Sequence, residues 1–590
     1  MARGAETRGP GPAVAAAAAV GVPMALLAVF FAWPVGAMLA RGLAPRALET
    51  LGSPRTWDLV ATTLRMAAAG TLGSVILGIP GAYALYVCRF PGQRALRAAA
   101  SVPFVLPTVV VGVAFRSLLG KDGAYSLLEL DGTETAVVAA MAFFNFSVVV
   151  RTVGTMWAGL DPRSADAARM LGAGPVRVFR TVTLPAIAPA IAGAASLVFL
   201  FCSTAYGIVM TLGGVSTLES EIWARTNRLN FDVAAGLSLV QFVIVALALI
   251  VSSRFSRSAA LRMARRKRRL RLADAPAVAF TAVVILALIL APMASLIARS
   301  LVHADAWSLE NYRQLATSGS GFTGGVTVIE ALGNSLRAAA YATIVALAVG
   351  VPLAFALSRP ARTRRVRIGQ SLAEAFAMAP LGVSSVTVGF GFLIALRGPP
   401  LELGSEAVPF AQAIVAVPMA LRALLPVLRA IDPRLREAAA MLGAGPARIL
   451  RTVDFPLAAK GLTLAAGFAL AISLGEFGAS SFLVSGENDT LPVLISRLLN
   501  RPGADNYGMA LAASVILGLL TALVMFLCEL PRGPEARTAA AEKAAKTAST
   551  EKGSAEPRIE ETKAMARIEE TKAMARIEET KAMARIEESK

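Results

Sequence analysis

Long apolar runs separated by short polar segments dominate the first 530 residues of the chain. Each run has roughly 20 residues or more, the length that crosses the hydrocarbon core of a bilayer as a helix. We therefore predict an all-α polytopic membrane protein with about twelve transmembrane helices. The expected spans are 13–39, 60–88, 99–119, 135–158, 186–213, 233–252, 276–298, 334–358, 371–396, 407–428, 457–484 and 507–529.

The overall composition agrees with this pattern. The 590 residues are 56% hydrophobic and only 16% charged, whereas a soluble domain carries about 25% charged residues. The three cysteines lie in or at the ends of apolar runs, so they predict neither a disulfide framework nor a metal site. A single histidine, His303, leaves little material for histidine-based hydrolysis or proton transfer. We expect no metal and no cofactor.

Basic residues between the apolar runs predict the orientation in the membrane. The segment 254–271 contains nine Lys or Arg residues and no acid, and further arginines lie in 89–97 and 359–367. With twelve spans these three segments share one side, which the positive-inside rule assigns to the cytoplasm. Both termini are then cytoplasmic. Binding of nucleic acid or lipid headgroups by 254–271 is the weaker alternative, and we expect membrane lipid but no nucleic acid among the partners.

The composition changes near residue 531 to Ala, Glu, Lys and Thr, with the nine-residue repeat RIEETKAMA from Arg558 onward. Nine residues place successive isoleucines half a helical turn out of phase, so no continuous apolar seam forms. Residues 532–590 hold 13 basic and 12 acidic side chains, which leaves almost no net charge. We therefore expect a solvated tail that transport does not need.

The membrane part of the chain is duplicated. Residues 161–185 read DPRSADAARMLGAGPVRVFRTVTLP, and residues 432–456 read DPRLREAAAMLGAGPARILRTVDFP. Shorter matches precede this pair, so we expect one six-helix unit to be used twice. Because six is an even number, the two copies run parallel, related by an axis along the membrane normal.

The duplicated segment predicts a bent pair of short helices. An aspartate at each N-cap, Asp161 or Asp432, is followed by a proline at the first helical position. Gly172 or Gly443 follows the helix and suits the left-handed conformation found past a helix end. Small alanines on the helix would let another surface approach its backbone closely.

This segment resembles the EAA signature of bacterial ABC importer permeases, in which an acidic residue and two alanines stand upstream of a glycine. The first copy has Asp in place of the signature's Glu. A duplicated alanine-rich linker is the alternative. The matching residues are Asp166, Ala167, Ala168 and Gly172 in the first copy and Glu437, Ala438, Ala439 and Gly443 in the second.

The resemblance extends over residues 13–530 and is greatest to the fused-dimer permeases of the thiamine and iron(III) uptake group. Similar stretches are FFN at 143–145, TLGG at 211–214, SLGEFG at 473–478 and NDTLP at 488–492. The last stretch resembles the thiamine members, which favours thiamine over iron(III). The resemblance implies a type I importer fold, a small cationic substrate and a place in the bacterial inner membrane.

The resemblance also implies partner proteins. In such importers the two EAA helices, here within 161–175 and 432–446, dock on a homodimeric ATP-binding cassette ATPase, and an extracytoplasmic solute-binding protein delivers the substrate. The chain itself has no GxxxxGK[ST] phosphate loop, so we expect a non-catalytic subunit. Its expected domains are 1–12, a cytoplasmic N-terminus; 13–253 and 276–530, the six-helix domains; 254–275, a basic cytoplasmic linker; and 531–590, the tail.

Two polar residues are candidates for the translocation path. Glu476 follows an uncharged apolar stretch and corresponds to Ala205 in the first half. It either lines an outer gate that attracts a cation or is a wetted carboxylate at the membrane boundary. Asn145 lies within an apolar span, where a hydrogen bond between helices is the alternative to a role in the path.

Two other function classes compete with the importer permease. A secondary transporter driven by an ion gradient can also have two parallel six-helix repeats. The loop 89–94, Arg-Phe-Pro-Gly-Gln-Arg, lacks the acidic residue of the major-facilitator signature, and buried charge is sparse. A membrane enzyme is disfavoured by the scarcity of paired intramembrane His, Asp or Glu.

Overall fold

A computed structural model of the chain describes residues 12–256, 268–269, 274–320, 325–361, 363–398, 401–404, 406–484 and 486–529. The expected tail (531–590) and most of the expected basic linker lie outside these residues. Within them, ten helices are long and apolar enough to cross a membrane, or eleven if a pair of helices bent by 99° counts as one span, against the twelve expected. The prediction of an all-α polytopic membrane protein is confirmed.

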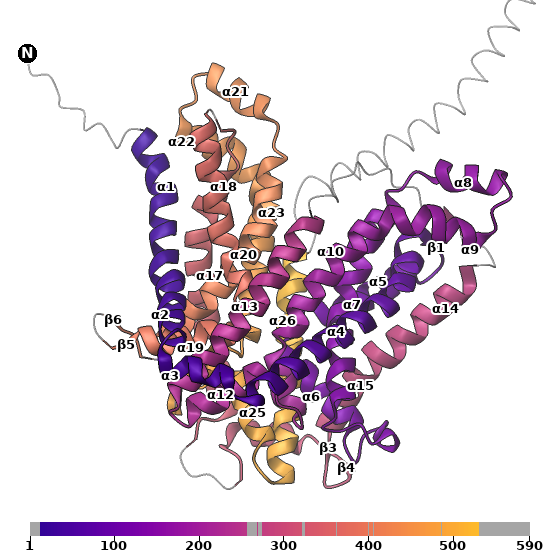
Figure 1. Cartoon of the computed structure of the whole chain (residues 1–590), viewed down its shortest axis with the longest axis vertical. Helices are drawn as coiled ribbons and strands as arrows, with labels where there is room; N and C mark the ends of the chain where they lie inside the picture. Colours follow the sequence, from indigo (N-terminus) through magenta and orange to yellow (C-terminus); the bar gives the residue numbers. More distant parts are fainter. Residues whose placement is uncertain are drawn as a thin grey trace, which may run out of the picture. The chain divides into compact units, whose positions relative to one another are not determined.

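The first half begins with one long bent span and alternates spanning with short helices (Figure 1). The elements are α1 (Pro12–Leu27), η1 (Ala28–Ala32), α2 (Trp33–Gly42), α3 (Pro45–Leu48), η2 (Glu49–Gly52), α4 (Pro54–Ala82), η3 (Tyr83–Val87), α5 (Gln93–Ser101), η4 (Val102–Phe104), α6 (Thr108–Leu119), η5 (Ser126–Leu128), α7 (Glu134–Ala158), α8 (Pro162–Met170), α9 (Pro175–Val178), η6 (Phe179–Thr183), α10 (Leu184–Ser203), α11 (Tyr206–Leu212), α12 (Leu218–Asn227) and α13 (Phe231–Ser256).

The second half repeats this order. Its elements are α14 (Ala275–Val284), η8 (Ile285–Leu290), α15 (Ala291–Ser300), α16 (Glu310–Arg313), η9 (Gln314–Ala316), α17 (Val328–Leu357), α18 (Arg364–Met378), η10 (Ala379–Gly382), α19 (Ser385–Ala395), α20 (Ala407–Arg429), α21 (Pro433–Met441), α22 (Pro446–Ile449), η11 (Leu450–Asp454), α23 (Phe455–Gly475), α24 (Ser480–Leu483), η12 (Gly486–Asn488), α25 (Leu491–Leu499) and α26 (Ala504–Glu529).

The described strands are only two residues long and form three isolated pairs. The parallel pair β1–β2 joins the first half to the segment between the halves, and β3–β4 and β5–β6 are antiparallel hairpins. Their bounds are β1 (Cys88–Arg89), β2 (Arg268–Arg269), β3 (Val302–His303), β4 (Ala306–Trp307), β5 (Arg397–Gly398) and β6 (Leu401–Glu402).

The structure corrects the expected spans at two places in each half. The third span is not one continuous helix: α5 and η4 end before α6 begins, and α18 and η10 end before α19 begins. The fifth span also ends earlier than expected, at Ser203 rather than 213 and at Gly475 rather than 484. Hydropathy remains high across these breaks, so the apolar pattern alone did not reveal them.

A π-helical turn precedes the fifth span in both halves. The turns η6 and η11 occupy equivalent positions of the duplication, and Pro185 or Pro456 follows each of them within two residues. Proline has no N–H to donate and its ring clashes with the carbonyl four residues earlier, so the helix widens locally instead of continuing unchanged.

The first span of each half packs against the opposite half. Helices α1 and α2 contact α17 and α19, while α14 and α15 contact α4 and α6. The turn η1 between α1 and α2 adds aromatic contacts to α20 and α18: Phe30 stacks on Phe410 with centroids 4.4 Å apart, and Phe31 meets the edge of Phe376 at 6.2 Å. This exchange ties the two halves together by packing as well as by the chain.

The substitution Gly391→Val tests the packing of the first span against the opposite half. Helices α2 and α19 approach so closely there that a Cβ on Gly391 would lie 2.8 Å from the carbonyl oxygen of Pro34. We expect Gly391→Val to destabilise the folded protein by about 1–3 kcal/mol, measured as a lower thermal unfolding midpoint in detergent. Gly36→Val is the control, because a Cβ there meets nothing within 4 Å. Equal midpoints for the two variants would contradict the close packing.

Candidate functional site

A cavity of about 310 Å³ lies between the two halves of the duplication. Its lining comes mainly from the four places where the third and fifth spans are interrupted, two in each half. Helices α7 and α20 contribute further residues. Both expected path residues, Glu476 and Asn145, line this cavity, whereas the interruptions of the third spans were not expected.

Local sequence explains the interruptions of the third spans. In the first half, Pro107 precedes α6, and the residue before a proline is disfavoured in helical conformation. In the second half, Ser384 takes the equivalent place at the N-cap of α19, and its Oγ accepts a hydrogen bond from Thr387 N at 3.1 Å. Both residues line the cavity.

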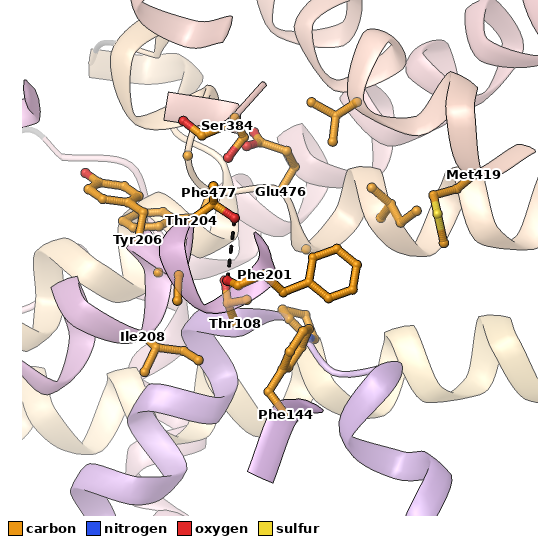
Figure 2. Close-up of a pocket in the computed structure, with 18 of the residues that line it drawn as sticks. Thr108, Phe144, Phe201, Thr204, Tyr206, Ile208, Ser384, Met419, Glu476 and Phe477 are labelled. Atoms are coloured by element: carbon orange, nitrogen blue, oxygen red, sulfur yellow. Dashed lines mark hydrogen bonds between the residues drawn. The ribbon is translucent and has the colours of Figure 1, made fainter. Parts of the chain in front are cut away.

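The fifth spans are interrupted at Ala205 in the first half and at Glu476 in the second. The Glu476 side chain is buried, with 6% exposure, and turns back onto the following backbone (Figure 2). Ala479 N and Ser480 N donate to its two carboxylate oxygens at 2.7 and 2.9 Å, and Ser480 Oγ donates at 2.7 Å. The carboxylate is therefore not a wetted group in this structure, and it accepts hydrogen bonds from the free N–H groups at the start of α24.

Two equivalent aromatic rings meet at the interface of the halves. Tyr206 and Phe477 occupy the same position of the duplication, and their rings stack with centroids 5.1 Å apart and an interplanar angle of 15°. Both line the central cavity, and Phe477 also lines a second cavity of about 450 Å³ that extends to Trp223 and Arg497. Phe477, with Tyr206 stacked on it, therefore lies between the two cavities.

Asn145 lies on α7 and also lines the central cavity. Its Nδ2 donates to Met141 O at 3.0 Å and to Cys202 Sγ at 3.4 Å, so the side chain joins α7 to α10 as the packing alternative requires. Its Oδ1 is buried without a hydrogen-bond partner. The geometry is compatible with both expected roles.

A second buried acid, Glu219 on α12, was not recognised in the sequence. It is 2% exposed, and Gln241 Nε2 lies 3.5 Å from its Oε1. Burial raises the pKa of Glu219 to about 8, because a carboxylate loses its hydration there. Its sequence neighbourhood, Thr217-Leu218-Glu219, looks like an ordinary helix start, so only the packing reveals its burial. Among the described residues, no group of three or more His, Cys, Asp or Glu side chains could hold a metal ion.

The two predicted bent helix pairs are present at equivalent positions. Asp161 Oδ1 accepts from Arg163 N at 2.9 Å, and Asp432 Oδ1 accepts from Arg434 N at 3.0 Å. Gly172 and Gly443 have φ values of 83° and 81°, in the left-handed region. In Figure 1, α8 and α21 lie at the same end of the helical bundle, opposite α12 and α25.

Both helices expose apolar side chains at their C-terminal ends. Met170, Leu171, Met441 and Leu442 are 87–89% exposed, a large fraction for such residues. Clustered exposed apolar side chains are typical of a protein interaction surface. The small residues of these helices were expected to form the contact surface, and the Met-Leu pairs were not, although the duplication repeats the pairs unchanged. The acidic residue and first alanine of each copy are exposed, and the second alanine is half-buried; these are Asp166, Ala167, Ala168, Glu437, Ala438 and Ala439.

Comparison with known proteins identifies the architecture. Residues 70–293 and 346–530 match the family described as binding-protein-dependent transport system inner membrane component. The thiamine transport system permease protein ThiP of Brucella abortus is 28% identical over 519 residues, which cover 83% of this chain and 89% of that protein.

Other similar proteins are also transport permeases, and they cover different shares of the chain. ThiP of Escherichia coli K12 is 26% identical over 505 residues, covering 82% of this chain and 90% of that protein. The sulfate transport system permease protein CysT of Salmonella typhimurium is 29% identical over 213 residues, covering 33% of this chain and 77% of that protein. The thiamine permeases therefore match across both halves.

Removing the stacked rings should join the two cavities. We expect Tyr206→Ala combined with Phe477→Ala to produce a leak of small ions in planar bilayers, because nothing of similar size replaces the rings. Phe30→Ala combined with Phe410→Ala is the control, since it removes a stacked pair that does not line either cavity. If the double variant at Tyr206 and Phe477 does not leak ions, other groups close the path.

Proposed function

We propose that this chain, which belongs to the family of binding-protein-dependent transport system inner membrane components, forms the whole translocation path of an importer for thiamine or a similar small organic cation. The principal observation is the match to thiamine permeases across both halves of a single chain. The cavity between those halves supports the proposal, because a path on the pseudo-twofold axis needs both copies.

The lining of the central cavity favours an organic cation. Five aromatic rings and one carboxylate line it, from Phe144, Phe201, Tyr206, Phe468, Phe477 and Glu476; Figure 2 labels all of them except Phe468. Aromatic faces attract organic cations, more strongly when water is excluded. Iron(III), the alternative cargo, prefers several oxygen ligands, and both Glu476 oxygens already accept hydrogen bonds from the protein. We therefore favour thiamine over iron(III).

The two bent helix pairs are the proposed connection to the energy source. We infer that α8 and α21 each dock on one copy of a homodimeric ATP-binding cassette ATPase, with the exposed Met-Leu pairs entering its surface. ATP hydrolysis then takes place on that separate chain, and an extracytoplasmic solute-binding protein delivers the cation at the opposite end. This arrangement places α8, α21 and both termini in the cytoplasm, as the basic segments also predict.

Reconstitution of the full chain in vesicles with its ATPase and binding protein tests the proposal. Uptake of radiolabelled thiamine should require ATP on the side of the membrane where the ATPase is bound. Uptake should persist when an uncoupler removes ion gradients. Uptake that needs the gradient but not the ATPase would favour a secondary transporter instead. Competition by unlabelled thiamine but not by chelated iron(III) would identify the cargo class.

In the same vesicles, Glu476→Gln should lower uptake of a cationic substrate by about tenfold, the effect of losing roughly 1.4 kcal/mol of attraction. Basal ATP hydrolysis and assembly with the ATPase should not change, because the glutamine can still accept a hydrogen bond from the backbone. Glu487→Gln is the control, since that side chain is exposed and lies outside the cavity. If Glu476→Gln takes up the substrate at the wild-type rate over a range of salt concentrations, Glu476 does not attract the cation. Its role is then only to accept hydrogen bonds from the N–H groups of Ala479 and Ser480.

Valine at both left-handed glycines should uncouple transport from ATP hydrolysis. Gly172→Val with Gly443→Val costs about 1–2 kcal/mol at each site, because a β-branched residue is strained at positive φ. Gly174→Val with Gly445→Val is the control, since those glycines have φ near −65° and open space around them. The first pair should hydrolyse ATP with little uptake, whereas normal uptake by correctly inserted protein would show that the turn is not needed for coupling.

A further inference from the structure

Asp454 joins two arginines from different segments at the cytoplasmic end of the second half. It lies in η11, and its side chain is completely buried. Arg436, on α21 itself, donates from Nε to Asp454 Oδ1 at 2.7 Å, and Arg359, from the loop after α17, donates to Oδ2. Arg436 Nη2 also reaches Leu428 O, at the end of α20, at 3.5 Å. These contacts tie α21 to α20, η11 and the loop after α17.

The first half has a cavity at the equivalent place. The duplication aligns Arg359, Arg436 and Asp454 with three small or apolar residues: Val87, Ala165 and Thr183. All three line a cavity of about 690 Å³ beside α8. The first half therefore lacks the charged side chains of this cluster and keeps open volume between α8 and its helices.

The aromatic residues that line this cavity also differ from the residues at the equivalent positions of the second half. Tyr83 and Trp157 have ring centroids 5.1 Å apart, and Trp157 and Phe179 have centroids 5.8 Å apart. The corresponding positions of the second half hold Phe355, Leu428 and Leu450. Large rings border the space in the first half, together with the buried Asp274, whose carboxylate accepts a hydrogen bond from Tyr83 Oη at 2.6 Å. In the second half the buried carboxylate of Asp454 is instead paired with two arginines.

The two arrangements have different mechanical consequences. A buried carboxylate that satisfies two guanidinium groups resists separation, because removing one partner leaves an uncompensated buried charge. Moving α21 away from its bundle would separate Arg436 from Asp454. Among the described residues, the ion pair of α8 joins Arg169 to Asp166 within the helix itself, so moving α8 breaks no such pair, and the cavity beside it leaves room for displacement.

We propose that Asp454, with Arg359 and Arg436, is a positioning residue that holds α21 rigidly for docking, whereas α8 moves relative to its own half. The inference rests on the proposed function only in naming α8 and α21 as the docking helices. The two docking helices then differ. A movement of the ATPase is transmitted through α21 directly to the spans of the second half, whereas part of that movement only displaces α8 relative to the first half.

Hydrogen exchange of the full-length protein in nanodiscs measures this difference without the ATPase or the substrate. The segments 162–171 and 433–442 share six of ten residues, and the rates are compared after division by the intrinsic rate of each amide. We expect the amides of α21 to exchange about tenfold more slowly than those of α8, the factor that about 1.4 kcal/mol of local opening free energy produces. Equal rates in the wild-type protein would overturn the proposal.

Exchanging the clusters between the halves assigns the effect to these residues. Arg359→Val, Arg436→Ala and Asp454→Thr together give the second half the residues of the first and leave no unpaired ion; exchange in α21 should then approach that of α8. The reciprocal variant, Val87→Arg with Ala165→Arg and Thr183→Asp, should slow exchange in α8, and it keeps the test decisive if the first triple variant does not fold.

Glu374→Gln is the matched control, because it breaks an exposed ion pair with Arg429, 2.6 Å long, that does not involve α21. It should leave both exchange rates unchanged. In reconstituted vesicles the first triple variant should lose several-fold in uptake per ATP hydrolysed while ATP hydrolysis continues. Unchanged exchange in α21 would overturn the positioning role even if uptake falls. Failure of the ATPase to bind wild-type protein would instead contradict the proposed function and leave the exchange result standing.

Discussion

Inside a bilayer, a backbone N–H or C=O that leaves a helix must find its partner within the protein, because lipid offers none. This requirement determines where the spans of this chain can be interrupted. The four interruptions gather at the interface of the two halves, where protein surrounds them. Ser384 and Glu476 accept hydrogen bonds from the freed N–H groups there, and Pro107 has none to satisfy. The same interruptions line the central cavity, which therefore lies where the backbone can be interrupted without leaving unsatisfied N–H or C=O groups.

The interface that permits these interruptions is held by the exchanged first spans. Helices α1 and α2 cover the second half, and α14 and α15 cover the first. In a membrane, helices associate through close packing and not through the hydrophobic effect, since lipid tails are as apolar as leucine. The contact of Gly391 with the Pro34 backbone and the stacking of Phe30 on Phe410 are of this kind.

The two halves have the same order of spans, but buried acidic residues of the second half have no acidic counterpart at the equivalent positions of the first half. Where the second half has buried acids, Glu476 at the cavity and Asp454 below α21, the first half has Ala205 and Thr183. Tyr206 and Phe477 differ by one hydroxyl group yet stack as equivalent rings. A pseudo-symmetric path can thus present a single charge to a single cargo, and pseudo-symmetric docking helices can differ in stiffness.

The sequence alone determined the membrane class, the two six-helix copies and the bent helix pairs, because each depends on local patterns. Apolar runs specify spans, and the order Asp, Pro, then Gly specifies a cap, a helix start and a left-handed end. Glu476 and Asn145 were found as polar residues in apolar surroundings. The exchange of first spans, the burial of Glu219, the stacking of Tyr206 on Phe477 and the pairing of Asp454 with Arg359 and Arg436 were decided only by the tertiary structure. Each of these joins residues far apart in the chain, and neither hydropathy nor helical period carries information about which distant surfaces will meet.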